Sequence, residues 1–327
     1  MLFSWQLTLI SKEKTMDKKT IQSSIMLTLT AFIWGVAFVA QSVGMDYVGP
    51  FTFNTVRSFL GGMVLIPCIL LFSNNKKTSG TVAKQSINNK LLSGFYDKKL
   101  IIGGISCGVI LFLASTLQQF GLIETTPGKA GFITALYILI VPLLGLFLKR
   151  RVSIKVWIGV GIAIIGMYFL CINEGFTIAK GDILLILCAI IFSGHILVID
   201  HFSPFVDGVK MSCIQFLVCG VLGLPFMLII EQPLIGDIIN AWQPILYAGV
   251  LSCGVAYTLQ IIGQKNMNPV IASLILSLES VFATVAGWLI LGDTLSRREI
   301  LGCMLVFAAI ILAQLPERKN ILAKFDS

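Results

Sequence analysis

Charged side chains are scarce in this sequence. Its 327 residues include 24 Lys and Arg and 16 Asp and Glu, so 12% of the chain is charged, whereas soluble domains have about 25%. A chain with half the usual charge cannot cover a water-facing surface of its own size. The composition therefore excludes a soluble globular enzyme, a disordered protein and a nucleic-acid-binding protein, and leaves lipid as the surrounding solvent.

Motifs for catalysis and cofactor binding are also lacking. The chain contains no Walker A, H-E-x-x-H or G-x-S-x-G pattern, which argues against nucleotide-driven transport or hydrolysis within it. Its eight cysteines lie in apolar runs and form no C-x-x-C pair, which favours small buried hydrophobic residues over metal ligands or disulfides. We therefore expect a protein that is not an enzyme and that uses no metal or cofactor.

Long apolar runs dominate what is present. Hydrophobic residues make up 56% of the chain, and the mean hydropathy is +0.92. A helix needs about 20 apolar residues to cross a bilayer, and it satisfies its own backbone polar groups there. The sequence predicts an all-α integral membrane protein with ten transmembrane helices, at residues 24–43, 51–72, 100–120, 128–148, 154–172, 182–200, 210–230, 243–263, 269–291 and 298–315.

The distribution of positive charge predicts the orientation. Of the 24 Lys and Arg residues, 19 fall in segments on the same side as the N-terminus, four fall on the opposite side, and Arg57 falls within a span. By the positive-inside rule, both termini are predicted to be cytoplasmic. Topology thus accounts for the net charge of +8 without an acidic substrate. The basic 73–99 loop is interpreted as a cytoplasmic connector near anionic lipid.

The ends of the chain lie outside the apolar runs. The first ten residues are too short to span a membrane and lack the pattern of a signal peptide, so we expect either a start at Met16 or a disordered extension. The predicted division comprises a cytoplasmic tail at 1–23, a first five-helix repeat at 24–172, a connector at 173–181, a second five-helix repeat at 182–315 and a cytoplasmic tail at 316–327.

The two predicted halves are related by an internal repeat. A shift of 142 positions places residues 116–118 on the identical residues 258–260 and Pro127 on Pro269, with nine identities in 36 gap-free pairs. Because each copy has an odd number of spans, the second copy enters the membrane in the reversed orientation. Inverted repeats are an architecture of secondary transporters, whose substrate site lies near the midplane between the copies. The repeat therefore indicates a transporter.

Several motifs carry a family resemblance. They are Ala31-Phe32-Ile33-Trp34-Gly35, Asn54-Thr55-Val56-Arg57, Ser115-Thr116-Leu117-Gln118-Gln119, Gly128-Lys129-Ala130-Gly131 and Ser277-Leu278-Glu279-Ser280. Together they resemble the drug/metabolite transporter superfamily, specifically its ten-span bacterial branch with two EamA domains, over about residues 20–316. Members often have Gly-Glu after the fourth and ninth spans, where this chain has Lys149-Arg150-Arg151 and Gly292-Asp293. The acidic charge is thus retained in the second copy and absent from the first.

The resemblance implies a function and a location. It implies secondary transport of a small metabolite, commonly export of amino acids or related compounds, by a multi-pass protein of the bacterial plasma (inner) membrane. The partners implied are a small-molecule substrate and membrane lipid, without nucleic acid. Two alternatives stay open. A non-transporting sensor or complex subunit needs no internal pseudo-symmetry, and uptake of a nucleotide or sugar derivative needs several cavity cations, for which Arg57 and Lys129 are the candidates.

Two charged residues, Glu279 and Arg57, lie deep within predicted spans, where a charge costs about 2.5–3.5 kcal/mol and is usually functional. Glu279 lies near the middle of the 269–291 span. It is either a partner for a proton or a substrate ammonium group, or a protonated carboxyl bound to a neighbouring helix. Its repeat mate is Tyr137, so we expect the two side chains to face each other. Arg57 either snorkels outward or binds a substrate carboxylate through two hydrogen bonds.

Other polar side chains complete the candidate pathway. His195, in the sixth span, is either a satisfied hydrogen-bonding residue or a proton-coupling group. Gln118 and Gln260 are repeat mates that either face a cavity or bind neighbouring helices. The remaining candidates are Trp34, Gln41, Asn54, Gln119, Tyr137, Gln215 and Tyr257.

Overall fold

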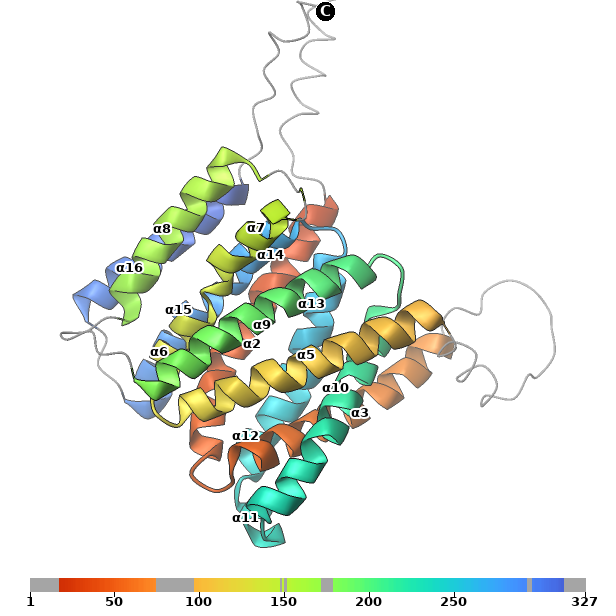
Figure 1. Ribbon diagram of the computed structural model, residues 1–327. Helices are drawn as coiled ribbons and strands as arrows, with labels where there is room; N and C mark the ends of the chain where they lie inside the picture. The colour runs from red at the N-terminus through yellow and green to blue at the C-terminus, as the bar shows by residue number, and fades with distance from the viewer. Residues whose placement is uncertain are drawn as a thin grey trace, which may run out of the picture.

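The computed structural model describes residues 18–74, 97–147, 149, 152–171, 179–292 and 296–314. The expected start at Met16, most of the 73–99 loop, and Asp293 lie outside these ranges. Within them the chain folds as helices joined by short turns, without a strand (Figure 1). The all-α prediction is confirmed.

The first half contributes five membrane-length or shorter apolar helices, the fourth of which is broken. These are α2 (Lys18–Gly44), α3 (Pro50–Asn74), α5 (Lys98–Leu122), α6 (Pro127–Thr134) followed by α7 (Tyr137–Phe147), and α8 (Ile154–Cys171). The first helix begins six residues before the predicted span at 24. Its first turns are polar, so a prediction based on the apolar run does not include them.

The second half repeats this order. Its elements are α9 (Lys180–Phe202), α10 (Gly208–Phe226) with η1 (Met227–Glu231), the short α11 (Ile235–Asn240), α12 (Trp242–Leu246) with η2 (Tyr247–Ala256) and α13 (Tyr257–Gln264), α14 (Pro269–Leu276) with α15 (Leu278–Ala286) and η3 (Gly287–Leu291), and α16 (Arg297–Gln314). The η segments are π-helical turns that continue their helices.

Eight of these helical stretches are long and apolar enough to cross a membrane, judged by length and composition, and two shorter apolar helices cover 154–169 and 300–313. The two shorter helices, in α8 and α16, pack against each other at one edge of the bundle (Figure 1). Together they account for the ten predicted transmembrane helices in two five-helix repeats.

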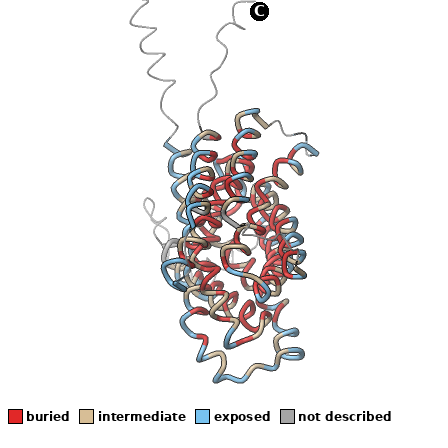
Figure 2. Tube along the Cα trace, turned by 90° about the vertical axis from the view of Figure 1, so that its left-hand side faces the viewer, coloured by how far each residue is buried: buried red, intermediate tan, exposed pale blue. Residues whose placement is uncertain are grey.

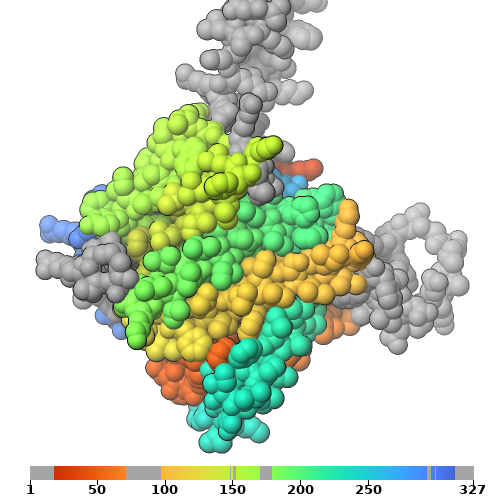
Figure 3. Space-filling view, viewed as in Figure 1, coloured from red at the N-terminus to blue at the C-terminus, as the bar shows by residue number. Residues whose placement is uncertain are grey.

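The packing between helices follows the pseudo-symmetry of the repeat. The first helix, α2, packs against α13 and α15 of the second half, and its counterpart α9 packs against α5, α6 and α7 of the first half. The second helices of the two halves, α3 and α10, pack against each other. Figure 3 shows α9 lying beside α5 across one face of the molecule. The first helix of each half therefore packs against helices of the other half.

Equivalent residues start equivalent helices. Thr126 caps α6 and Asn268 caps α14, and each is followed by a proline. Proline is preferred at the first position of a helix, because it has no N–H group to leave unpaired there. The start of α3 is capped by the other half of the chain. The carboxylate of Glu231 accepts hydrogen bonds from the backbone N–H groups of Phe51 and Thr52, at 2.8 and 2.7 Å.

Buried residues fill the centre of the bundle and exposed ones cover its outside (Figure 2). The outer surface carries large apolar side chains such as Ile158, Ile186 and Leu301, as expected where lipid is the solvent. The interior holds polar groups as well, including Gln119, His195 and Gln215 with no exposed surface. Buried polar groups inside a membrane bundle mark the region in which to look for a pathway.

Candidate functional site

The two repeats meet at a direct contact between equivalent residues. Tyr137 donates a hydrogen bond to Oε1 of Glu279 at 2.8 Å, and the two residues are 142 positions apart, which is the offset of the repeat. A residue that touches its own repeat mate must lie close to the pseudo-two-fold axis. The predicted pairing of a phenol with a carboxyl group is therefore confirmed, and it marks the centre of the molecule.

Helix breaks place both side chains of this pair. Tyr137 is the first residue of α7, just after the turn that ends α6, and Glu279 is the second residue of α15, just after the turn at Ser277. Both residues are 3% exposed. The turns at 135–136 and 277 are equivalent under the repeat, so the same local irregularity brings the two side chains together from opposite halves.

A cavity surrounds this pair. Its volume is about 30 Å³, and it lies between α2, α3, α5 and α6–α7 on one side and α9, η2–α13 and α15 on the other. Its lining residues are Trp34, Ala37, Phe38, Gln41, Arg57, Gln118, Thr134, Tyr137, Phe192, Ser252, Tyr257 and Glu279. The cavity thus takes polar and aromatic side chains from both repeats.

Arg57 brings a positive charge to the same cavity. Its side chain is buried at 6% exposure, and its Nη1 donates a hydrogen bond to Oε1 of Gln41 at 2.7 Å. Its guanidinium carbon lies 5.5 Å from the centre of the Phe53 ring. Of the two interpretations of Arg57, outward snorkelling does not fit this geometry, because the charged group points into the bundle.

Arg57 and Glu279 line the cavity without forming an ion pair with each other. Arg57 comes from α3 in the first repeat and Glu279 from α15 in the second. A cation and an acid on separate walls of one cavity can hold the two ends of a small molecule that carries both charges. The amide of Gln41 fixes the guanidinium, so its remaining N–H groups are oriented.

Aromatic and amide side chains form the rest of the wall. The rings of Trp34 and Tyr257 lie 4.6 Å apart, and the indole N–H of Trp34 has no hydrogen-bond partner within the protein. The side-chain amide of Gln118 donates to Oγ1 of Thr134 at 3.4 Å. These groups present donors and flat apolar surface together, as small-molecule sites do.

Other sequence candidates are buried outside the cavity lining. His195 lies 3.2 Å from Oε1 of Gln215, and Gln119 donates to the sulfur of Met45 at 3.0 Å. The side-chain oxygen of Gln260 and both polar atoms of the Asn54 side chain have no partner within the protein. The repeat mates Gln118 and Gln260 thus have different surroundings, because Gln118 lines the cavity and Gln260 does not.

Five lining residues were not among the candidates from the sequence: Ala37, Phe38, Thr134, Phe192 and Ser252. One of them could have been found by symmetry. Phe192 lies on α9, the first helix of the second repeat, just as Trp34 lies on α2, the first helix of the first repeat, and both line the cavity. The others are small or apolar residues, whose types give no indication of a cavity. In the described ranges, no group of three or more metal-ligating side chains gathers.

A family model places the chain among known proteins. The model of the EamA-like transporter family matches residues 22–172 and again residues 179–315. The chain therefore belongs to the EamA-like transporter family, in the drug/metabolite transporter superfamily, and it is a multi-pass membrane protein built from two copies of the family's domain. Each copy of the match spans five of the ten helices.

Individual relatives agree with this assignment. The chain is 30% identical over 303 residues to an "Uncharacterized transporter" of Archaeoglobus fulgidus, covering 91% of this chain and 87% of the relative. It is 23% identical to the "Uncharacterized transporter YoaV" of Bacillus subtilis, covering 90% and 96% of the two chains. One solved crystal structure has a TM-score of 0.69 at 18% identity, covering 93% of this chain and 99% of that chain, which shows a shared fold.

Proposed function

We propose that this protein is a secondary transporter that exports a small zwitterionic metabolite, an amino acid or a related compound, by alternating access. The observation that carries the proposal is the central cavity, which has Arg57 on a wall from the first repeat and Glu279 on a wall from the second. Substrate carboxylate would bind the guanidinium, and substrate ammonium would bind the carboxylate of Glu279.

The division into repeats at 24–172 and 182–315 supplies the moving units of the proposal. Secondary transporters with inverted repeats rock one part against the other around a site near the midplane. The Tyr137–Glu279 hydrogen bond crosses between the repeats, so binding at Glu279 and movement at the axis would be coupled. In the proposed topology, both termini are cytoplasmic and the protein lies in the plasma membrane of a bacterium.

The cavity favours a zwitterion over a phosphorylated substrate. A nucleotide or sugar phosphate needs several cations, and Arg57 is the one Lys or Arg residue among the described lining residues. Lys129, the other candidate from the sequence, instead forms an ion pair with Asp182 at 2.8 Å near the start of α9. It therefore neutralises a neighbouring carboxylate and does not reach the cavity.

Metabolite profiling tests the proposal directly. Cells that overproduce the protein are compared with cells that carry an empty vector and with cells that produce Arg57→Gln or Glu279→Gln at matched membrane levels. We expect one or more amino acids or related zwitterions to accumulate in the medium with the wild-type protein and not with the variants. Accumulation of phosphorylated compounds, or identical media from all four strains, would contradict the proposal.

A further inference from the structure

Three helices enclose a second cluster of polar side chains next to the cavity. His195 on α9, Ser212 and Gln215 on α10, and Gln260 and Gln264 on α13 are each no more than 1% exposed. They lie toward the end of the bundle formed by the turn after α9 and the start of α10, where Gly208 approaches Ile261 and Ile262 of α13. The cluster thus extends from the centre toward one end of the helices.

Hydrogen bonds tie α9 to Gln215 of α10 and to Gln264 of α13. His195 lies 3.2 Å from Gln215, and the amide of Gln264 donates to the backbone oxygen of Ile196 at 3.4 Å. Tyr257, Gln260 and Gln264 lie three and four residues apart on α13, so they share one face of that helix. The ring of Tyr257 lies 5.9 Å from the ring of His195, and Tyr257 also lines the cavity.

Each of the five side chains keeps a buried polar atom without a protein partner. These atoms are Nδ1 of His195, Oγ of Ser212, Nε2 of Gln215, Oε1 of Gln260 and Oε1 of Gln264. Leaving a buried donor or acceptor unsatisfied costs about 1–3 kcal/mol. Five such atoms on three adjacent helices would be strongly unfavourable in a dry core, and internal water commonly satisfies groups of this kind.

The hydrogen bond of His195 determines what its free nitrogen can do. An amide oxygen only accepts hydrogen bonds, so the Nε2 that faces Oε1 of Gln215 carries the proton of the neutral ring. Nδ1 then holds a lone pair and can accept a proton from water. The positively charged ring that results keeps its hydrogen bond to Gln215.

We propose that α9, α10 and α13 enclose a buried site for ordered water, in which His195 accepts protons at Nδ1 and which links the central cavity to one end of these helices. A proton that enters from the end of the helices passes from one water to the next, so each water that gives a proton also receives one and the positive charge ends on the His195 ring. The site differs from the cavity, since none of the five side chains lines that space. It requires only water, and it does not depend on the identity of the substrate.

No carboxylate contacts His195 from the elements packed against it. The titratable groups on those elements are Tyr257 of α13, Tyr137 of α7, Lys98, Lys99 and Cys107 of α5, Lys210, Cys213 and Cys219 of α10, and Lys129 of α6, which is paired with Asp182. On α9 itself, Cys188 lies toward the other end, and Asp200 and His201 lie beyond His195 in the last turns. Water is therefore the proton donor available to Nδ1.

Nuclear magnetic resonance of labelled histidine tests the site. The chain contains two histidines, so protein in lipid nanodiscs gives two ring signals, and His201→Gln assigns them. We expect magnetisation transfer from water to the His195 ring, and protonation at Nδ1 as the pH falls from about 8 to about 3. A ring that shows no transfer from water and keeps one neutral form over this range would overturn the proposal.

A variant locates the water. Gln260→Leu removes one of the unpaired oxygen atoms and fills its place with apolar atoms, so we expect exchange between water and the His195 ring to slow several-fold. Gln243→Leu, at an exposed position on α12, makes the same chemical change outside the site and should leave the exchange rate unchanged. Equal exchange in the wild type and Gln260→Leu would show that water reaches His195 by another route, contrary to the proposal.

Discussion

Glu279 and Tyr137 occupy equivalent positions, yet they differ in chemistry. Both are buried at the pseudo-axis and share one hydrogen bond, but an acid with an ordinary pKa near 4.3 and a phenol with one near 10 respond to different pH ranges. The site is therefore asymmetric within a nearly symmetric fold. A single carboxyl group at this place can alternate between a proton and a cationic group of the substrate.

The variant Glu279→Gln tests this role. Glutamine keeps the size of the side chain and can accept the hydrogen bond from Tyr137, so we expect normal insertion and folding. Loss of the charge removes an interaction of about 1.5–3 kcal/mol, so transport should fall by about tenfold or more and its pH dependence should flatten. Flux measured across a series of pH values checks this, together with the amount of folded protein.

Tyr137→Phe provides the matched control for the same contact. It removes the donor and leaves the carboxyl group, so we expect a milder loss of transport in which the pH dependence is retained. If Glu279→Gln transports at the wild-type rate with an unchanged pH profile, the carboxyl group has a structural role only.

Arg57 gives a second prediction at this scale. Arg57→Gln should weaken the apparent affinity for a carboxylate-bearing substrate about tenfold to hundredfold, because hydrogen bonds to charged groups contribute about 1.5–3 kcal/mol and about 1.4 kcal/mol is a factor of ten. Arg57→Lys retains the charge but loses the planar guanidinium group, so its affinity for the substrate should lie between those of the wild type and Arg57→Gln. Competition by amino acids and by their decarboxylated amines measures the effect. Equal loss toward both classes of compound would contradict a carboxylate contact.

The sequence could predict which residues are buried and polar, but not which face of the bundle each one lines. Glu279, Tyr137 and Arg57 stood out because ionisable and repeat-related groups are rare in spans. Gln118 and Gln260 looked equivalent, yet Gln118 meets Thr134 at the cavity, whereas the repeat mate of Thr134 is Leu276. Gln260 therefore lacks the equivalent hydroxyl partner, and its side-chain oxygen has no partner within the protein.

At the scale of the helical elements, the broken helices were not foreseen. The apolar runs at 128–148 and 269–291 look continuous, and Pro142 lies beyond the break in the first of them. The breaks come from tightened turns, in which the backbone N–H of Leu136 bonds to the oxygen of Ile133 and that of Ser280 to the oxygen of Ser277. Such turns keep nearly the same side-chain period as a helix, so hydrophobic periodicity cannot reveal them.

Close approach of helices across the repeats makes a prediction about stability. A Cβ atom at Gly35 of α2 would lie 2.8 Å from the backbone nitrogen of Ala283 in α15, which is too close for the helices to keep their distance. Gly35→Ala should therefore destabilise the fold by about 1–3 kcal/mol, the usual cost of overpacking. Thermal unfolding in detergent measures this as a lower Tm.

Gly161→Ala in α8 is the matched control, because a Cβ at that position meets no atom within 4 Å. Alanine also favours a helix over glycine by about 1 kcal/mol, so the Tm of this variant should stay the same or rise. A Tm of Gly35→Ala equal to that of the wild type would mean that α2 and α15 are not in close contact.

For the whole molecule, the exchange of first helices explains why the cavity lies where it does. Because α2 packs in the second half and α9 in the first, the walls that carry Trp34 and Phe192 each stand against helices of the other repeat. The sequence predicted the inverted repeat from the 142-residue offset, but it contained no information on which helix pairs across the axis. That choice depends on packing between side chains far apart in the chain.

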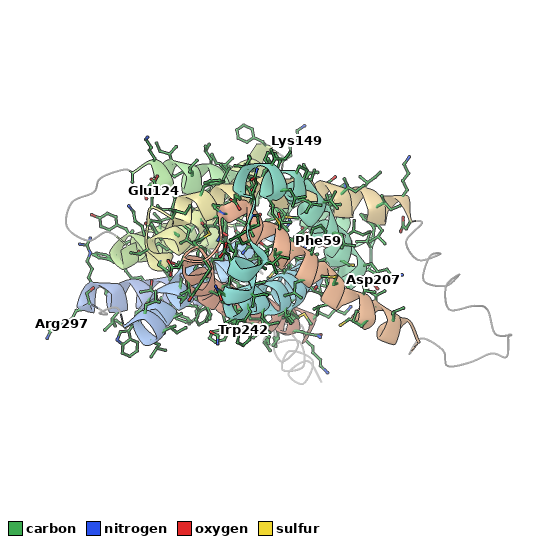
Figure 4. The ribbon with its side chains drawn as sticks, turned by 90° about the horizontal axis from the view of Figure 1, so that it is seen from below. Phe59, Glu124, Lys149, Asp207, Trp242 and Arg297 are labelled. Atoms are coloured by element: carbon green, nitrogen blue, oxygen red, sulfur yellow. The ribbon has the colours of Figure 1, made fainter. Side chains whose placement is uncertain are left out.

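The orientation in the membrane gives the last prediction. An even number of crossings places both ends of the chain on one side, and the first turn of α2 and the last turn of α16 lie toward the same side of the bundle (Figure 1). Glu124 and Arg297 lie toward one end of the molecule and Asp207 toward the other (Figure 4), as alternation of the turns requires.

We expect the end with Asp207 to face the cytoplasm, because 19 of the 24 Lys and Arg residues fall on that side. Reporter fusions after residue 99 and after the last residue should both be active as cytoplasmic reporters and inactive as periplasmic ones, whereas a fusion after Thr125 should give the opposite result. Periplasmic activity at either of the first two positions would reverse or break the predicted topology.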